Sequence, residues 1–457
     1  MPIVSHVRSS ELRSLATRLD PEYFLPARIQ ASGILESYPH KTLLGTMCST
    51  ITQGPNPKFA ETGVACLNGK NIYFGSASTG EPNYVPPGEF ARFKNYVLQG
   101  GDIVITLKHA TKIGRAWIID HGPQKIFSRN VGLIRLREGT PVSAASLLFF
   151  LWSDVGQRVL DRFSTGGTTG QITLAISYLR RLWVPIFPER RQRELDSYLQ
   201  RYSQLQNKGE LLYTSAEETL LNSLGIRQVD LPHPLAYNAS LTQISKARRW
   251  DAEHFRPKYE VLLDAIRRAP SWRSLGQMAT FNFRGLQPQY VDDGTVAVVT
   301  SQHLGPHHLA YGHLERTSEE AYTTASRARV RRGDVLVYTT GAYVGRTNVF
   351  LSDIKALASN HVNIIRLKPE YDPAYVALFL NSFPGLLQTE KHAAGSAQAE
   401  LYPSGLAKFI IPLLQTETMQ QIGDRVRKSY QIMTEAKGLL ENARRTVEEL
   451  VEKGARP

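Results

Sequence analysis

The sequence predicts an α+β fold, with two duplicated domains of mixed short strands and helices separated by two long helices packed as an antiparallel coiled coil. Three observations lead to this prediction. The chain of 457 residues repeats itself at an interval of about 231 residues, far more than the 20 to 50 residues of solenoid repeats. Each copy contains short β-branched runs bounded by Gly, Pro, Asn or Asp. Each copy then ends in a long segment with a seam of residues alternately three and four positions apart, apolar in the second copy and more polar in the first.

The repeat keeps its register across well-separated segments. Arg18-Leu19-Asp20 recurs as Arg249-Trp250-Asp251, and Gly101-Asp102-Ile103 recurs as Gly333-Asp334-Val335. A register shared over this distance indicates duplicated domains. Repeated units often create extended binding surfaces, although a duplication kept only for symmetry or stability is an alternative.

Each copy is expected to run through the same elements in the same order. A short helix opens each copy, at 21–36 and at 255–268. The β-branched runs predict strands at 64–67, 102–107 and 131–136 in the first copy, and at 296–300, 334–339 and 362–367 in the second. An apolar helix follows at 143–162 or 375–392, and then a loop of small residues at 165–171 or 394–398 leads into a strand that ends at Pro185 or Pro412.

The segments after these two prolines are each expected to form one long helix, and their apolar stripes predict a helix-helix seam. A helix of about 32 residues would be roughly 48 Å long at 1.5 Å per residue. The alternative is that each helix covers its own domain, because amphipathic helices carry similar stripes. The predicted seam residues are Leu195, Leu199, Tyr202, Tyr213, Leu220, Ile422, Val426, Met433, Leu440 and Val447.

These elements predict five parts along the chain. They are a first domain at 1–186, a first long helix at 187–225, a linker at 226–245, a second domain at 246–412 and a second long helix at 413–457. Pro232 and Pro234 mark the linker.

The composition favours a polyanionic partner. Lys and Arg number 54 against 41 Asp and Glu, for a formal net charge of +13. With two cysteines, neither a disulfide framework nor a four-ligand zinc site is expected. The N-terminal residues do not resemble a signal peptide, and the longest apolar run is too short to cross a bilayer, so a cytoplasmic protein without a membrane partner is expected.

Catalytic motifs are incomplete. Asn56-Pro57-Lys58-Phe59 approaches the Asn-Pro-Pro-aromatic segment of amine methyltransferases but has Lys in place of the second Pro. Residues 63–71 approach a P-loop but have the wrong spacing and end in Asn71. The histidines between His303 and His313 have no cysteine or carboxylate partners at ligand spacing. The chain is therefore predicted to bind and not to catalyse, with no metal and no cofactor of its own.

Two β-rich domains, each followed by a long helix, resemble the specificity (S) subunit of type I restriction-modification systems. The resemblance covers nearly the whole chain. Its markers are Thr168-Thr169-Gly170-Gln171 through Pro185 with Gln192, and Ser396-Ala397-Gln398 through Pro412 with Gln420. The segment after Pro185 departs from the family, because it is Arg-rich where the family has a Pro-Leu-x-x-Gln run, so that boundary is approximate.

The resemblance implies that each domain is a target recognition domain that reads one half of a bipartite, asymmetric, gapped DNA target. It implies docking to two methyltransferase subunits and to restriction (translocase/nuclease) subunits in a phage-defence complex that methylates DNA. S-adenosylmethionine, ATP and Mg would then belong to those partners. Two alternatives stay open: a non-catalytic scaffold that binds nucleic acid or protein, and a self-contained DNA modification or nicking enzyme.

DNA contacts are expected from polar side chains on the loops that follow the strands. Lys and Arg would mostly bind phosphates, whereas Asn, Gln and Ser would read base edges; solvated surface is the alternative for each residue. Arg115 and Arg346 occur in both copies and are expected to be shared scaffold or phosphate contacts. The copies differ most at 53–90 and 282–322, which predicts two different half-sites. The predicted contacts are Lys58, Asn68, Lys70, Asn71, Lys108, Thr111, Lys112 and Arg115 in the first copy, and Gln287, Gln289, Ser301, Gln302, His303, Thr340, Tyr343 and Arg346 in the second.

Overall fold

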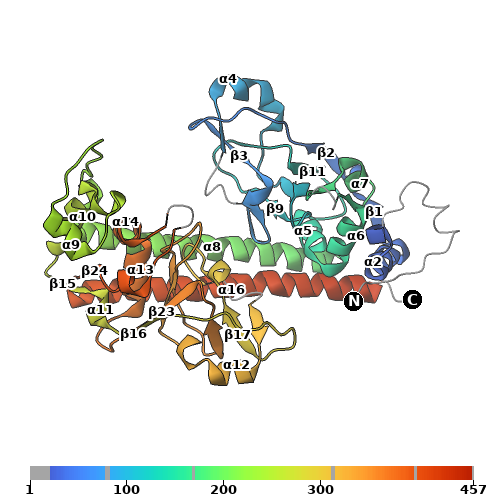
Figure 1. Ribbon diagram of the computed structural model, residues 1–457. Helices are drawn as coiled ribbons and strands as arrows, with labels where there is room; N and C mark the ends of the chain where they lie inside the picture. Colours follow the sequence, from blue (N-terminus) through green and yellow to red (C-terminus); the bar gives the residue numbers. More distant parts are fainter. Residues whose placement is uncertain (1–20, 78–82, 167–169, 310–313, 396–398, 455–457) are drawn as a thin grey trace. The chain divides into compact units, whose positions relative to one another are not determined.

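The computed structural model describes residues 21–77, 83–166, 170–309, 314–395 and 399–454 (Figure 1). The chain forms two compact units, 1–204 with 435–457 and 205–434. Each unit contains a domain of mixed strands and helices, as the α+β class predicts, together with part of two long helices, α8 (Glu189–Leu224) and α16 (Thr416–Gly454). The sequence markers at residues 18–20, 168–169 and 396–398 lie outside the described residues.

The domain of the first unit is built on a four-stranded antiparallel sheet in the order β2-β11-β7-β9. These strands are β2 (Cys48–Gln53), β11 (Val131–Leu136), β7 (Ile103–Thr106) and β9 (Ala116–Ile118). A second sheet pairs β10 (Lys125–Phe127) in parallel with β3 (Val64–Leu67), which pairs with β6 (Asn83–Val85). The β-branched run of β7 is buried along its whole length, because the strand lies inside the sheet with helices and strands on both faces.

The domain of the second unit has a four-stranded sheet of the same order and strand directions, β16-β23-β20-β21. Its strands are β16 (Ala279–Arg284), β23 (Val362–Leu367), β20 (Val335–Tyr338) and β21 (Thr347–Val349). The second sheet contains β18 (Glu315–Thr317), β17 (Val296–Val299), β22 (Ala356–Ala358) and β19 (Arg329–Val330), with β17 and β22 parallel. In both units the strand before the long helix pairs with a strand near the start of the domain: β14 (Trp183–Pro185) with β1 (Lys41–Leu43), and β24 (Ile410–Leu413) with β15 (Ser271–Ser274).

The apolar helix predicted at 143–162 is two helices, α5 (Ala144–Trp152) and α6 (Asp154–Phe163). Ser153 separates them, because its backbone is extended (ψ 157°) and its Oγ accepts a hydrogen bond from the Gly156 amide at 3.1 Å. Ser382 also has an extended backbone (ψ 163°) and divides the second predicted helix into α13 (Pro373–Asn381) and α14 (Phe383–His392), although its side chain makes no cap hydrogen bond to α14. The prediction of one continuous helix was wrong in both copies, because apolar periodicity does not reveal a serine at a helix junction.

Gly156 allows the sharp junction between α5 and α6. A Cβ at this position would lie 2.1 Å from the Phe150 carbonyl oxygen. We expect Gly156→Ala to lower the free energy of unfolding by about 1 to 3 kcal/mol through overpacking. Gly33→Ala, in helix α2 where a Cβ meets nothing within 4 Å, should instead stabilise by about 0.5 to 1 kcal/mol. Thermal unfolding of the two variants measures both effects, and equal shifts would contradict the steric explanation.

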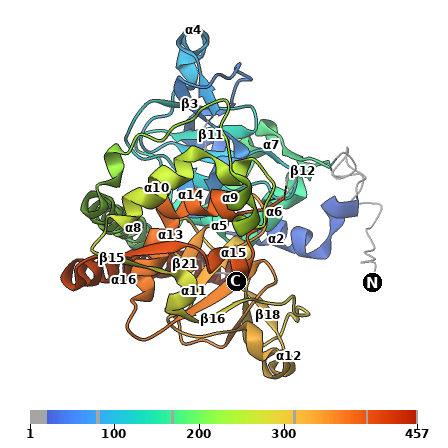
Figure 2. The same cartoon turned by 60° about the vertical axis from the view of Figure 1, so that its left-hand side comes forward.

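The opening helices are shorter than predicted, and each follows a 3-10 turn. They are α2 (Pro26–Ser37) after η1 (Pro21–Phe24), and α10 (Pro257–Arg267) after η5 (Glu253–Phe255). Figure 2 shows α10 beside α14 in the second unit. Between α8 and α10 the chain forms η4 (Ile226–Gln228) and α9 (Leu241–Ala247).

Short elements complete the two units. In the first they are α3 (Leu44–Met47), η2 (Gly69–Asn71), β4 (Ile72–Tyr73), β5 (Ser76–Ala77), α4 (Pro87–Phe90), η3 (Ala91–Tyr96), β8 (Lys108–His109), β12 (Ser164–Thr165), β13 (Ile172–Leu174) and α7 (Ile176–Arg180). In the second they are α11 (Leu275–Met278), η6 (Ser301–His303), α12 (Glu319–Thr324), η7 (Ser326–Ala328) and α15 (Pro403–Leu406).

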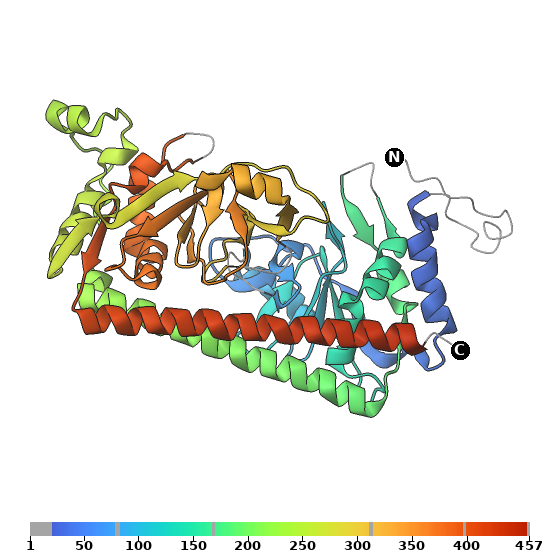
Figure 3. The same ribbon diagram turned by 90° about the horizontal axis from the view of Figure 1, so that it is seen from below.

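The segments of α8 and α16 that belong to the second unit lie side by side (Figure 3, green and red), and in the first unit Arg201 of α8 forms an ion pair with Glu435 of α16 at 3.2 Å. In the second unit the Ser429 hydroxyl donates to the Gly209 carbonyl oxygen at 2.7 Å, and Arg425 donates to the Thr219 hydroxyl at 2.8 Å. Residue numbers therefore rise along one helix as they fall along the other, so these two segments run antiparallel.

The predicted seam residues are buried, except for Leu199 and Leu440, which are half-buried. In the second unit Tyr213, Leu220, Ile422 and Val426 belong to one apolar core with α10, α13 and the four-stranded sheet. In the first unit the Tyr202 hydroxyl donates to the Gly75 carbonyl oxygen of the β4-β5 hairpin at 2.6 Å. The seam positions therefore contact the domain as well as the other helix, a combination that the sequence pattern alone does not distinguish.

Candidate nucleic-acid interface

A 3-10 turn follows strand β3 and carries three of the predicted DNA contacts. The Asn68 amide donates to the Asn71 Oδ1 at 2.9 Å, so the Asn71 side chain closes the turn. Asn71 is only 6% exposed, whereas Lys70 in the middle of the turn is exposed. The structure therefore gives Asn71 a structural hydrogen bond and presents Lys70 to solvent.

The second domain has a turn of the same construction after β17. The Thr300 amide donates to the His303 Nδ1 at 3.0 Å, and the His303 Nε2 lies 3.3 Å from the Glu315 Oε2. His303 is 7% exposed, whereas Gln302 is exposed. We call residues 68–71 and 300–303 the capped turns. In each of them the third residue of the 3-10 helix (Asn71 or His303) is buried and the second (Lys70 or Gln302) is exposed.

An arginine present in both copies contacts the backbone at each capped turn. The Arg115 guanidinium donates to the Gly69 carbonyl oxygen at 3.2 Å, and the Arg346 guanidinium donates to the Leu304 carbonyl oxygen at 3.5 Å. Each guanidinium also lies over a half-exposed tyrosine ring, 5.5 Å from Tyr73 and 4.0 Å from Tyr343. These contacts agree with a scaffold role for both arginines.

A loop beside each capped turn carries further predicted contacts. Lys108 starts this loop in the first domain, and its carbonyl oxygen lies next to Gly69. The Thr111 amide donates to the His109 Nδ1 at 3.1 Å, which folds the loop back, and the Lys112 ammonium lies 5.1 Å from the ring of Phe74. This contact between Lys112 and Phe74 was not predicted from the sequence, although the adjacent aromatic residues Tyr73 and Phe74 could have indicated an aromatic neighbour.

The corresponding loop of the second domain runs from Thr340 to Arg346. Thr340 forms an isolated β-bridge with Glu400. Its hydroxyl is buried, and among the described residues it has no hydrogen-bond partner; the same is true of the Asn68 Nδ2 and the Arg115 Nε. Buried polar atoms are nearly always hydrogen-bonded, so the lack of a described partner for these three atoms is unusual.

The other predicted contacts lie farther along the surface. Lys58 is exposed between β2 and β3. Gln287 and Gln289 are exposed after β16, where the Gln289 carbonyl oxygen accepts from the Thr317 hydroxyl of β18 at 2.7 Å. No described interaction joins these three side chains to the capped turns, so the structure groups thirteen of the sixteen predicted residues around the turns and their loops and leaves these three apart.

The two interfaces differ in charge at corresponding positions. Lys70, Lys108 and Lys112 of the first domain correspond to Gln302, Thr340 and Tyr343 of the second. The first interface is therefore basic at three positions where the second is neutral, although the two turns have the same hydrogen-bonded frame.

Each four-stranded sheet also has a buried ion pair, between the aspartate just before β7 or β20 and an arginine of β11 or β23. Asp334 accepts two hydrogen bonds from Arg366, at 2.8 and 2.7 Å, and Asp102 accepts two from Arg135, both at 2.7 Å. The two aspartates are 1% and 2% exposed. Burial raises the pKa of Asp334, and the hydrogen bonds from Arg366 and from the Arg331 amide oppose that rise.

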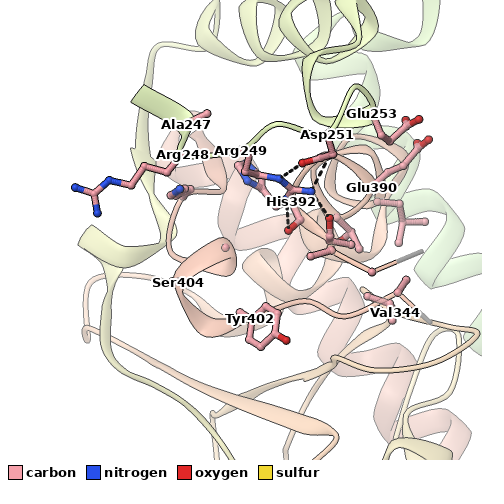
Figure 4. Close-up of a pocket in the computed structure, with 18 of the residues that line it drawn as sticks. Ala247, Arg248, Arg249, Asp251, Glu253, Val344, Glu390, His392, Tyr402 and Ser404 are labelled. Carbon is pink, nitrogen blue, oxygen red and sulfur yellow. Dashed lines mark hydrogen bonds and ion pairs between the residues drawn. The ribbon is translucent and has the colours of Figure 1, made fainter. Parts of the chain in front are cut away.

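The second unit also contains a cavity of about 1140 Å³ beside the loop 340–346 (Figure 4). Arg249 and Asp251, from the repeated Arg-x-Asp motif, form a bidentate ion pair there, with N–O distances of 2.7 and 2.9 Å. Arg249 also donates to the carbonyl oxygens of His392 and Ala393 at 3.1 and 2.9 Å. The motif therefore binds the C-terminal end of α14, where a positive charge is favourable.

His392 at this helix end makes the second unit sensitive to acid. Burial lowers the pKa of His392 to about 3, and burial also lowers the pKa of the neighbouring His254. Below pH 6.5 the unfolded chain takes up a proton at His392 that the folded chain does not, so stability falls by up to about 1.4 kcal/mol per pH unit. We expect the unfolding temperature to drop between pH 6.5 and 5. His392→Gln should reduce the drop, whereas exposed His233→Gln should leave it unchanged; an equal drop in both variants would contradict this.

The described residues contain no group of three or more His, Cys, Asp or Glu side chains arranged to hold a metal ion. In the same part of the chain, none of the helices combines the length and the apolar character needed to cross a membrane.

No protein-family model and no curated protein matches the sequence. Among solved structures, the chain is similar to the S subunit of a type I restriction-modification system from M. genitalium, with 11% identity, a TM-score of 0.45, and coverage of 91% of this chain and 96% of that one. It is also similar to the HsdS subunit from Thermoanaerobacter tengcongensis, with 16% identity, a TM-score of 0.29, and coverage of 91% and 96%. A third similar chain comes from a study of complex assembly and conformational transition of the type I R-M system, with 15% identity, a TM-score of 0.29, and coverage of 91% and 97%.

Proposed function

We propose that this protein is the DNA-specificity subunit of a type I restriction-modification complex. The observation that carries the proposal is the pair of capped turns. Both have the same hydrogen-bonded frame and the same arginine at the backbone, yet they expose different side chains, Lys70 and Gln302. A constant frame with a variable exposed residue is what two readers of different half-sites require, because phosphate and scaffold contacts position a protein while base contacts specify the sequence.

The proposal assigns roles to the parts of the chain. Residues 1–186 and 246–412 would be two target recognition domains that arose by duplication, and each would read one half of an asymmetric, gapped target. The long helices at 187–225 and 413–457 would pack as an antiparallel coiled coil, and the linker 226–245 would connect the first of them to the second domain. This coiled coil would set the gap and dock two methyltransferase subunits. Two modest half-site affinities joined at a set spacing give one strong, register-specific affinity.

Catalysis would belong to the partners. The chain would bind double-stranded DNA in the cytoplasm and carry no catalytic residue, metal or cofactor. S-adenosylmethionine would bind to the methyltransferase subunits, and ATP and Mg would serve the restriction subunits. This division agrees with the incomplete methyltransferase and P-loop motifs of the sequence.

Methylation mapping tests the proposal. The chain would be co-expressed with the methyltransferase encoded beside it, the complex purified, and adenine methylation of plasmid DNA mapped by single-molecule sequencing. We expect methylation at one asymmetric motif with a gap. A complex that binds DNA without sequence preference would favour the scaffold alternative, and modification or nicking by the chain alone would favour the self-contained enzyme.

A further inference from the structure

We propose that the cavity beside the loop 340–346 binds backbone phosphates of the DNA that flanks the second half-site, through Lys246, Arg248 and Lys408. This inference rests on the proposed function and adds a phosphate-binding site that lies apart from the capped turn. All three side chains are exposed, and they come from two segments far apart in the sequence.

The charge difference between the interfaces motivates the proposal. Lysines at three positions of the first interface are replaced by Gln302, Thr340 and Tyr343 in the second. Most of the affinity of a protein for DNA comes from Lys and Arg that neutralise phosphates and release counterions. A second domain that binds its half-site with comparable strength therefore needs cations at another position close to the same loop.

The cavity meets this need in position. Gly341, Ala342 and Val344 form part of its wall, and they are sequence neighbours of the predicted contacts Thr340 and Tyr343. DNA in contact with the exposed face of Tyr343 would therefore lie next to the opening of the cavity. Because glycine and alanine dominate this wall, a sugar-phosphate backbone can approach the main chain closely.

The ionic state of the lining residues favours an anion. The carboxylates of the lining are already paired: Asp251 with Arg249 at 2.7 Å, Glu253 with Arg256 at 2.7 Å, and Glu390 with Lys258 at 2.6 Å. Lys246, Arg248 and Lys408 have no ion pair with any described residue. Figure 4 shows Arg248 at the rim with its guanidinium extended away from the Arg249–Asp251 pair, so it is free to bind a phosphate outside the cavity mouth.

Salt dependence of DNA binding tests the site. The triple variant Lys246→Gln, Arg248→Gln, Lys408→Gln would be compared with the control Arg268→Gln, Arg273→Gln, Lys368→Gln, which removes the same charge from exposed positions of the second unit outside the cavity. Binding of the full methyltransferase complex to a duplex with the mapped motif would be followed by fluorescence anisotropy over a range of salt concentrations. Each lost phosphate contact lowers the slope of log K against log[salt] by about 0.9.

We expect the slope to fall by about 2 to 3 for the cavity variant and by less than about 1 for the control, with the methylated motif unchanged in both. Equal slopes for the two variants would overturn the phosphate site while leaving the proposed function intact. Loss of the methyltransferase subunits from the purified cavity variant, with the slope retained, would also overturn it and would indicate an acidic protein segment as the occupant. If the unmodified complex showed no motif-specific binding, the proposed function itself would fail.

A crosslink gives a second readout that does not depend on affinity. Ser404→Cys places a thiol in the cavity wall, and a photoreactive azidophenacyl group attached to it should crosslink to DNA beyond the outer end of one half-site. The same label on Lys368→Cys serves as the control. Crosslinks of equal yield and scattered position from both sites would contradict the proposal.

Discussion

Asp334→Asn is expected to lower the stability of the second unit by about 3 kcal/mol, a loss large enough to unfold a marginally stable domain. The aspartate is 1% exposed and accepts two hydrogen bonds from Arg366 and one from the Arg331 amide. Asparagine keeps the shape but removes the charge, so the Arg366 guanidinium loses its counter-ion in a largely buried position. Removal of one partner of a buried ion pair typically costs about 3 to 5 kcal/mol, and the partial exposure of Arg366 places the expected value at the lower end.

The matched control is Asp353→Asn. Asp353 pairs with Arg332 at 3.2 Å on the surface of the same domain, and its side chain is 82% exposed. Exposed pairs contribute about 0 to 1 kcal/mol. Chemical denaturation of both variants gives the comparison, and equal losses would show that burial is not the cause. Arg366→Met added to Asp334→Asn should cost less than the sum of the single losses, because the double variant leaves no unpaired buried charge.

Gln302→Ala is expected to relax the methylated motif at one base position of one half-site and to leave the other half-site unchanged. Gln302 is exposed, while its neighbour His303 holds the turn through Thr300, so the substitution removes a proposed base contact without loosening the frame. A bidentate contact from Gln to adenine gives about 1 to 3 kcal/mol of discrimination against other bases. Single-molecule sequencing of plasmid methylated by the variant complex would show the degenerate position.

Lys70→Ala in the first domain is the counterpart of this experiment. Lys70 has the same position in the other capped turn, so any change of motif should appear in the opposite half-site, together with a smaller salt dependence of binding. If Gln302→Ala and Lys70→Ala relaxed the same half-site, or if neither variant relaxed any base position, the capped turns would not read the two halves separately.

Much of the architecture follows from local patterns. The strands at 64–67, 131–136 and 362–367 begin and end where the β-branched runs predict them, and α8 and α16 lie within a few residues of the predicted helices. Periodicity, β-branched residues and bounding glycines or prolines act over a few residues, so a sequence displays them directly. The division of the predicted helix at Ser153 was missed, because the sequence does not distinguish a serine that caps a helix from a serine exposed on its surface.

In the candidate site, such local patterns do not predict which polar side chains are buried and which are exposed. The sequence placed Asn71 and His303 among the DNA contacts, because both are polar residues in a loop after a strand. The structure uses both side chains to close a 3-10 turn, and whether a polar side chain points inward depends on the backbone of that turn.

The sequence by itself determined the repeat, the order of strands and helices in each copy, the two long helices and the excess of positive charge. Only the tertiary structure decided which side chains meet: the Asp334–Arg366 pair joins residues 32 positions apart, and the cavity collects residues from 246 to 408. The physical reason is that secondary structure depends on short-range sterics and burial. An ion pair or a cavity forms instead when distant segments pack at a distance and orientation that no local pattern encodes.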